Sequence, residues 1–205
     1  MRSRSPQGFA APLRISARDL ALIVVFAGLT AALGLLPAIP VPWFPAPITA
    51  QSLGIILAGS ILGGWRGAVS QGLFLALVAL GLPLLAGGRG GIGVFLGPTW
   101  GFLLGYMVVA GLVGLFVYRI GAPYVLWKGL SVNIVFGMGA LYLFGLVGIV
   151  ISAKLSFVAA LAANVAYLPG DTLKCVLAAL VAKGVHAAVP GMLPWRDSFR
   201  APVER

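Results

Sequence analysis

The most informative stretch of this sequence places an acid and a base after a Pro-Gly pair, at Tyr167-Leu168-Pro169-Gly170-Asp171-Thr172-Leu173-Lys174. Proline is tolerated in a first helical turn, which predicts that a helix begins here with Asp171 near the positive end of its dipole. Asp171 and Lys174 share one helix face because residues three apart are neighbours on its surface. A charged side chain in the middle of a membrane helix costs about 2.5–3.5 kcal/mol on insertion scales. The pair is therefore either a self-neutralising anchor at a helix end or part of a small-molecule site.

The composition is that of an integral membrane protein without a separate soluble domain. Of the 205 residues, 60% are hydrophobic and 9% are charged, whereas soluble domains carry about 25% charged residues. The formal net charge is +10, but the basic residues flank apolar runs. A nucleic-acid-binding protein clusters them on a polar face, so no nucleic-acid partner is expected. Cys175 and His186 are the single cysteine and the single histidine, so neither a disulfide framework nor a metal site is expected.

Apolar runs along the chain predict an all-α protein with six transmembrane helices. The expected spans cover residues 20–36, 48–64, 67–86, 98–118, 129–151 and 170–188. Residues 155–168 are apolar but too short to cross, so we expect a short or re-entrant helix that leads into the Pro-Gly-Asp stretch. The chain then divides into a cytoplasmic N-terminal segment (1–18), a single membrane domain (19–190) and a cytoplasmic C-terminal tail (191–205).

The distribution of positive charge predicts the orientation of these spans. With both termini inside, eleven of the 14 Lys and Arg residues fall on the inner side, as the positive-inside rule requires. These eleven are Arg2, Arg4, Arg14, Arg18, Arg66, Arg119, Lys128, Lys183, Arg196, Arg200 and Arg205. Arg89, Lys154 and Lys174 fall outside. Charges kept outside against this bias are better candidates for ligand contacts than for topology signals.

Arg89 lies in the most glycine-rich segment of the chain, residues 87–93. Gly88, Gly90 and Gly93 satisfy GxGxxG, but that dinucleotide fingerprint needs a preceding strand and a βαβ unit around it. A glycine-rich backbone at membrane depth is either a flexible linker or a segment that folds back closely to line a cavity. A guanidinium in such a segment makes a two-pronged contact to a carboxylate.

Aromatic and polar side chains are expected on the same outer side. The aromatic candidates to cover an apolar ring or chain are Trp43, Phe44 and Trp100. Thr49 and Gln51 lie near the outer end of the second span. Together with the three charged residues Arg89, Asp171 and Lys174, they suit a small amphipathic ligand that carries a carboxylate and N–H donors and binds from outside.

Small residues on two of the expected spans predict close helix packing. Ala27 and Ala31 form a small-xxx-small face on the first span, and Gly97, Gly101 and Gly105 form a stripe on the fourth. Packing within the chain accounts for the glycine stripe. For the alanine face, packing within the chain and docking of a partner helix are equally good explanations.

Three blocks of the sequence resemble the BioY family, the biotin-specific substrate-binding (S) components of energy-coupling-factor (ECF) transporters. The blocks are Pro47-Ile48-Thr49-Ala50-Gln51, Gly81-Leu82-Pro83-Leu84-Leu85-Ala86-Gly87-Gly88-Arg89-Gly90-Gly91 with Gly97-Pro98-Thr99, and Leu168-Pro169-Gly170-Asp171-Thr172-Leu173-Lys174. They occur in the order and spacing of that family. One departure is Trp100, which stands where the family pattern leads us to expect glycine and whose indole would wall or crowd the pocket.

The resemblance implies high-affinity biotin binding from the outer face and biotin uptake by an S-component fold in a bacterial cell membrane. It assigns Arg89, Asp171 and Lys174 to the biotin pocket, with Asp171 on the ureido N–H groups and both basic residues on the valerate carboxylate. Gln51, Thr49 and Trp100 are further candidates for the biotin pocket.

The resemblance also implies partner subunits. It places Ala27 and Ala31 on the face that docks to the transmembrane coupling (T) subunit. The sequence contains no GxxxxGK[ST] pattern, so ATP hydrolysis is expected from separate ATPase subunits. We expect no enzymatic activity and no cofactor, with biotin as the transported ligand.

Other functions predict different sequence features. An S component for thiamine or riboflavin should lack the paired Gly-Arg and Pro-Gly-Asp blocks. An intramembrane enzyme should show a His, Cys or paired-carboxylate constellation, and a channel should show a file of polar residues through several spans. Neither of the last two patterns is visible in the sequence.

Overall fold

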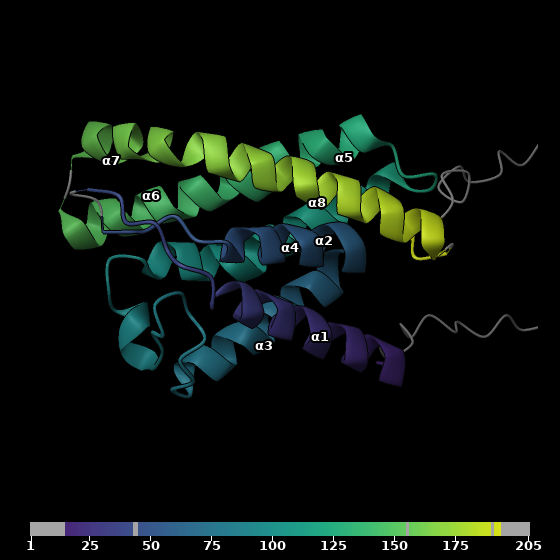
Figure 1. Ribbon diagram of the computed structural model, residues 1–205, viewed down its shortest axis with the longest axis horizontal. Helices are drawn as coiled ribbons and strands as arrows, with labels where there is room; N and C mark the ends of the chain where they lie inside the picture. The colour runs from purple at the N-terminus through teal and green to yellow at the C-terminus, as the bar shows by residue number, and fades with distance from the viewer. Residues whose placement is uncertain (1–14, 43–44, 155, 190, 194–205) are drawn as a thin grey trace, which may run out of the picture.

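The computed structural model describes residues 15–42, 45–154, 156–189 and 191–193, and this part of the chain is helical (Figure 1). The α-helices are α1 (Ala17–Leu33), α2 (Gln51–Leu62), α3 (Gly64–Ala79), α4 (Trp100–Ile120), α5 (Leu126–Val132), α6 (Ala140–Ala153), α7 (Phe157–Asn164) and α8 (Leu168–Ala188). Three short elements complete the fold: the 3-10 helices η1 (Ile92–Phe95) and η3 (Val165–Tyr167), and the π-helical segment η2 (Asn133–Gly139). Isolated bridges join Ile39 to Ile48 and Leu85 to Arg89.

The ends of the helices sort into two sides of the molecule. The beginning of α1, the α2–α3 junction and the end of α8 lie at one end, and the loops 34–50 and 80–99 lie at the other (Figure 1). The first end carries the ion pair between Asp19 and Arg66, with 2.7 Å between Oδ1 and Nε. Ser16 begins α1 there with a capping box, in which its side chain accepts a hydrogen bond from the Asp19 backbone N–H.

Helices long and apolar enough to cross a membrane account for the second half of the described chain. These stretches are Trp100–Ile120, Leu126–Ala153, which runs through α5, η2 and α6, and Phe157–Ala188, which runs through α7, η3 and α8. The earlier helices α1, α2 and α3 are shorter. α2 is the most enclosed of the helices: all but one of its residues are buried, and it packs against α1, α3, α4 and α8.

The predicted short helix at 155–168 is α7 (Phe157–Asn164), and the predicted helix of the Pro-Gly-Asp stretch is α8, which begins at Leu168 with Pro169 and Asp171 in its first turn. The structure adds that the 3-10 turn η3 joins the two, so that Phe157–Ala188 form one helical run. Pro169 has no N–H to donate, and the chain accommodates it by tightening Val165–Tyr167 into a 3-10 turn.

The glycines of α4 allow α6 to approach closely. A Cβ added to Gly101 would lie 2.1 Å from the Phe144 carbonyl oxygen, and one added to Gly105 would lie 3.1 Å from Phe144 Cβ. A Cβ added to Gly97 would meet only its own turn, at 3.7 Å from the Val94 carbonyl oxygen. The predicted packing stripe is therefore confirmed for Gly101 and Gly105.

Candidate functional site

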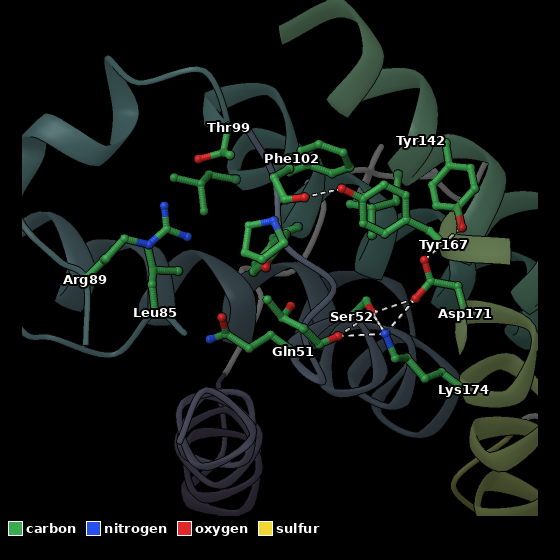
Figure 2. A pocket seen from close by; sticks show the side chains of 16 residues that line it. Gln51, Ser52, Leu85, Arg89, Thr99, Phe102, Tyr142, Tyr167, Asp171 and Lys174 are labelled. Carbon is green, nitrogen blue, oxygen red and sulfur yellow. Dashed lines mark hydrogen bonds and ion pairs between the residues drawn. The ribbon is translucent and has the colours of Figure 1, made fainter. Parts of the chain in front are cut away.

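A cavity opens between the loop that precedes α2, the start of α2, the loop 80–91, α4, α6 and α8 (Figure 2). Its polar lining residues are Thr49, Gln51, Ser52, Arg89, Thr99, Asp171 and Lys174, and its aromatic lining residues are Phe102, Tyr106, Tyr142 and Tyr167. The three charged residues predicted from the sequence therefore share one cavity. They lie at two ends of it: Arg89 at one end, and Asp171 with Lys174 at the other (Figure 2).

Both oxygens of the Asp171 carboxylate accept hydrogen bonds from neighbouring side chains. Its Oδ1 accepts hydrogen bonds from Lys174 Nζ at 2.7 Å and from Ser52 Oγ at 3.2 Å, and its Oδ2 accepts one from the Tyr142 hydroxyl at 2.9 Å. Asp171 is 6% exposed. A buried charge is tolerated only when it is paired and hydrogen-bonded, which these contacts from α2, α6 and α8 achieve.

Lys174 balances this carboxylate. Its ammonium donates to Asp171 Oδ1, to the Thr49 carbonyl oxygen at 2.6 Å and to Ser52 Oγ at 3.0 Å. An ammonium has three N–H groups, and these three acceptors account for all of them. Lys174 therefore orients Asp171 and ties α8 to the start of α2.

Arg89 sits on a tight backbone turn at the other end. Leu85 and Arg89 exchange two backbone hydrogen bonds, and Gly87 and Gly88 between them have φ values of 78° and 69°, which glycine adopts without strain. The Nε group of Arg89 donates to the Ala86 carbonyl oxygen at 3.3 Å. The two terminal nitrogens of the guanidinium point into the cavity (Figure 2). Of the two alternatives for the glycine-rich segment, the structure therefore favours a backbone that folds back to line a cavity over a flexible linker.

Gln51 and Thr49 line the cavity, but both already form hydrogen bonds within the protein. The Gln51 amide bonds to backbone groups of Thr30, Leu84 and Ala86, and the Thr49 carbonyl accepts from Lys174. The loop that carries Thr49 is held by the Ile39–Ile48 bridge and by a hydrogen bond from the Tyr167 hydroxyl to the Ala46 carbonyl oxygen.

Trp100 does not line the cavity, which corrects its expected placement at the pocket wall. Its indole Nε1 donates instead to the Ser152 hydroxyl of α6 at 2.8 Å, on the exposed side of the α4–α6 pair. The cause is the close contact of Gly101 with α6, which turns the neighbouring residue outward. Trp43 and Phe44, the other aromatic candidates, lie outside the described residues.

Other lining residues were not singled out from the sequence as site candidates. Ser52 and Tyr142 contact Asp171, and Phe102 and Tyr106 add aromatic surface from α4. Tyr167 directly precedes the Leu-Pro-Gly-Asp motif, but the motif does not indicate the direction of the Tyr167 side chain. The sequence carried one weak signal for Ser52 and Tyr142. A hydroxyl inside an apolar span needs a hydrogen-bond partner, and a buried aspartate is such a partner.

The alanine face of α1 points inward. Ala27 is 3% exposed and belongs to the main hydrophobic core, and Ala31 packs against that core. Packing within the chain is therefore the explanation that fits Ala27 and Ala31. Gly28 and Ala32, one residue further along, are exposed, and a Cβ added to Gly28 would have no neighbour within 4 Å.

Cys175 and His186 take part in packing contacts on α8. Cys175 Sγ contacts the Asn133 carbonyl oxygen at 3.4 Å, and His186 Nε2 lies 2.9 Å from the Ser60 carbonyl oxygen. Within the part of the chain that the structure describes, no three His, Cys, Asp or Glu side chains come together as metal ligands would.

Comparison with known proteins shows the family of this chain. A model of the BioY family matches residues 5–191. The "Biotin transporter BioY" of Rhodobacter capsulatus is 44% identical over 186 residues, which cover 86% of this chain and 97% of that protein. The protein of the same name in Rhizobium etli is 42% identical over 192 residues, which cover 89% and 100%.

A solved structure extends the comparison to three dimensions. It is the crystal structure of the S-component for biotin from an ECF-type ABC transporter, with a TM-score of 0.81 and 29% sequence identity over 87% of this chain and 95% of that chain. The predicted S-component fold is therefore confirmed. From the family match and the two relatives, this chain belongs to the BioY family.

Proposed function

We propose that this protein binds biotin from the outer face of a bacterial cell membrane and takes it up as the substrate-binding subunit of an ECF transporter. The observation that carries the proposal is one cavity with a guanidinium at one end and a neutralised aspartate–lysine pair at the other. Biotin has a carboxylate at one end and ureido N–H groups at the other. The relatives named as biotin transporters support the same ligand.

The contacts within the cavity favour a revised division of roles among the charged residues. Asp171 accepts a ureido N–H group, since a carboxylate has about four lone-pair sites and three are occupied here, which leaves one for the ligand. Arg89 alone takes the valerate carboxylate, because its terminal nitrogens face the cavity. Lys174 has no N–H group left for the ligand, so we assign it to holding Asp171. The aromatic side chains Phe102, Tyr106 and Tyr142 cover the apolar middle of the ligand.

The proposed arrangement in the membrane has six spans with both ends of the chain inside. The spans are α1, α2, α3, α4, the stretch from α5 to α6 and the stretch from α7 to α8. The ion pair between Asp19 and Arg66 marks the inner side, and the Arg89 loop opens to the outer side. This arrangement agrees with the charge distribution of the sequence.

Coupling to energy is proposed to come from partners. A T subunit and ATPase subunits would form the transporter, as the ECF-type structure with the same fold suggests. On α1, the exposed small residues Gly28 and Ala32 replace Ala27 and Ala31 as the proposed docking face, because a partner helix reaches only exposed residues.

Calorimetric titration of the detergent-purified protein tests the ligand. We expect sub-micromolar binding of biotin, with no comparable binding of thiamine or riboflavin. Biotin amide, which lacks the carboxylate, should bind at least about tenfold more weakly, because a hydrogen bond to a charged group contributes about 1.5–3 kcal/mol. Absence of sub-micromolar biotin binding would overturn the proposed function. Equal binding of biotin and its amide would overturn the role of Arg89.

A further inference from the structure

Two adjacent residues at the start of α2 serve opposite ends of the cavity. Ser52 Oγ donates to Asp171 Oδ1 and accepts from Lys174 Nζ. The Gln51 side chain runs the other way, toward the loop that carries Arg89 (Figure 2). Gln51 and Ser52 both lie in the first turn of the buried helix α2. The two ends of the cavity are therefore attached to the same rigid element.

The side-chain amide of Gln51 forms all of its hydrogen bonds with backbone groups. Its Nε2 donates to the Thr30 carbonyl oxygen at 3.3 Å and to the Leu84 carbonyl oxygen at 3.1 Å, and its Oε1 accepts from the Ala86 N–H at 3.1 Å. Gln51 is 1% exposed. Each of its two N–H groups is used, and so is an oxygen lone pair, so its main role in this arrangement is to hold α1 and the loop 84–86 against α2.

The loop residue that Gln51 holds is also the one that holds Arg89. The N–H of Ala86 donates to Gln51 Oε1, while the carbonyl oxygen of Ala86 accepts from Arg89 Nε at 3.3 Å. The Leu85–Arg89 bridge closes the turn around this residue. A guanidinium anchored through Nε cannot follow a ligand freely, so its position depends on where Ala86 lies.

The same junction leaves no space at the end of α1. A Cβ added to Gly34 would lie 2.4 Å from the Leu84 carbonyl oxygen and 2.9 Å from Gln51 Nε2. Real Cβ atoms do not approach a backbone oxygen that closely, so an alanine at position 34 pushes the loop or the Gln51 amide away. The junction is therefore perturbed independently through Gln51 and through Gly34.

We propose that Gln51 is a positioning residue that sets the distance between Arg89 and the Asp171–Lys174 pair, and that the cavity thereby selects its ligand by length. The proposal rests on the proposed function, since it takes biotin as the molecule that spans the two ends. A side chain one methylene shorter or longer would leave either the carboxylate or the ureido group without its partner.

Binding titrations test the selection by length. The probes are biotin and two analogues with a side chain one methylene shorter or longer. We expect the wild-type protein to prefer biotin over both by at least about tenfold, as one methylene typically contributes. Gln51→Met and Gly34→Ala should each reduce this preference below about threefold.

Two matched variants control for general effects. Gln71→Met removes another buried glutamine, whose Nε2 donates to the Thr30 hydroxyl at 3.1 Å. Within the described residues, Gln71 forms no hydrogen bond to the loop 84–86, so it serves as the control. Gly184→Ala adds a methyl group where no atom lies within 4 Å. Both variants should keep the wild-type preference. An unchanged preference in Gln51→Met, or an equal loss in Gln71→Met, would overturn the proposal.

Hydrogen exchange without ligand tests the positioning itself. The Ala86 amide of Gln51→Met should exchange about tenfold faster than in the wild type, because one hydrogen bond that protects it is lost. The corresponding amide of Gln71→Met should exchange at the wild-type rate. Unchanged exchange in Gln51→Met would overturn the proposal even if biotin binds, whereas failure of the wild type to bind biotin would overturn only the function on which it rests.

Discussion

At the scale of single residues, the Asp171–Lys174 pair acts as a unit. Asp171 is buried and Lys174 is half-buried, and each balances the charge of the other, so removing one leaves an uncompensated charge. We expect Asp171→Asn and Lys174→Ala each to weaken biotin binding by at least about tenfold, which corresponds to the 1.5–3 kcal/mol of a charge-assisted hydrogen bond. Binding isotherms of the purified variants measure both losses.

The double variant separates the roles of the two residues. If Lys174 only orients Asp171, Asp171→Asn combined with Lys174→Ala should bind biotin within about threefold of Asp171→Asn alone, because interacting residues are not additive. Lys183→Ala, an exposed lysine on the same helix, is the control and should bind like the wild type. Multiplicative losses in the double variant would show instead that Lys174 contacts the ligand directly.

At the scale of elements, the contact between α4 and α6 determines the cavity wall. Gly101 lies against the backbone of α6 at Phe144 and Gly148, and this contact carries Phe102 and Tyr142 toward the cavity from the two helices. Gly101→Ala should lower the free energy of unfolding by about 1–3 kcal/mol, as overpacking of a close contact does. Thermal unfolding in detergent measures the loss.

Gly97→Ala is the matched control for this prediction. The position belongs to the same glycine stripe, but an added Cβ would stand at ordinary van der Waals distance from its nearest neighbour. It should unfold within about 0.5 kcal/mol of the wild type, as a surface substitution away from special features does. If Gly97→Ala and Gly101→Ala lose the same stability, the contact with α6 does not account for the loss.

At the scale of the whole molecule, the exposed face of α1 with Gly28 and Ala32 is the proposed docking surface for a T subunit. Gly28→Trp places a large ring where the chain itself offers no neighbour, so it should leave biotin binding within about twofold of the wild type. It should prevent co-purification with a T subunit, because small residues allow two helices to approach closely. Gly184→Trp, at an equally open position on α8, should assemble normally. Normal assembly of Gly28→Trp would place the docking face elsewhere.

The sequence by itself determined the class of protein and the charged residues of the candidate site, and it predicts an orientation in the membrane. Hydropathy and the positions of Lys and Arg are properties of the chain read in order, so they need no knowledge of which helices meet. The same reading selected Arg89, Asp171 and Lys174, since charges on the apolar outer side stand out without any structure. The three motif blocks then predicted the family, which the comparisons confirmed.

Only the tertiary structure decided which way each side chain points and what it meets. A helix turns by about 100° per residue, so a shift of one position separates inward Ala27 from outward Gly28. Trp100 lies outside the pocket because α4 and α6 touch at Gly101, and a 3-10 turn joins α7 to α8 directly before Pro169. Gln51 holds the Arg89 loop through backbone groups that are distant in the sequence. Such contacts depend on which segments pack together, and the order of residues along one segment does not contain that information.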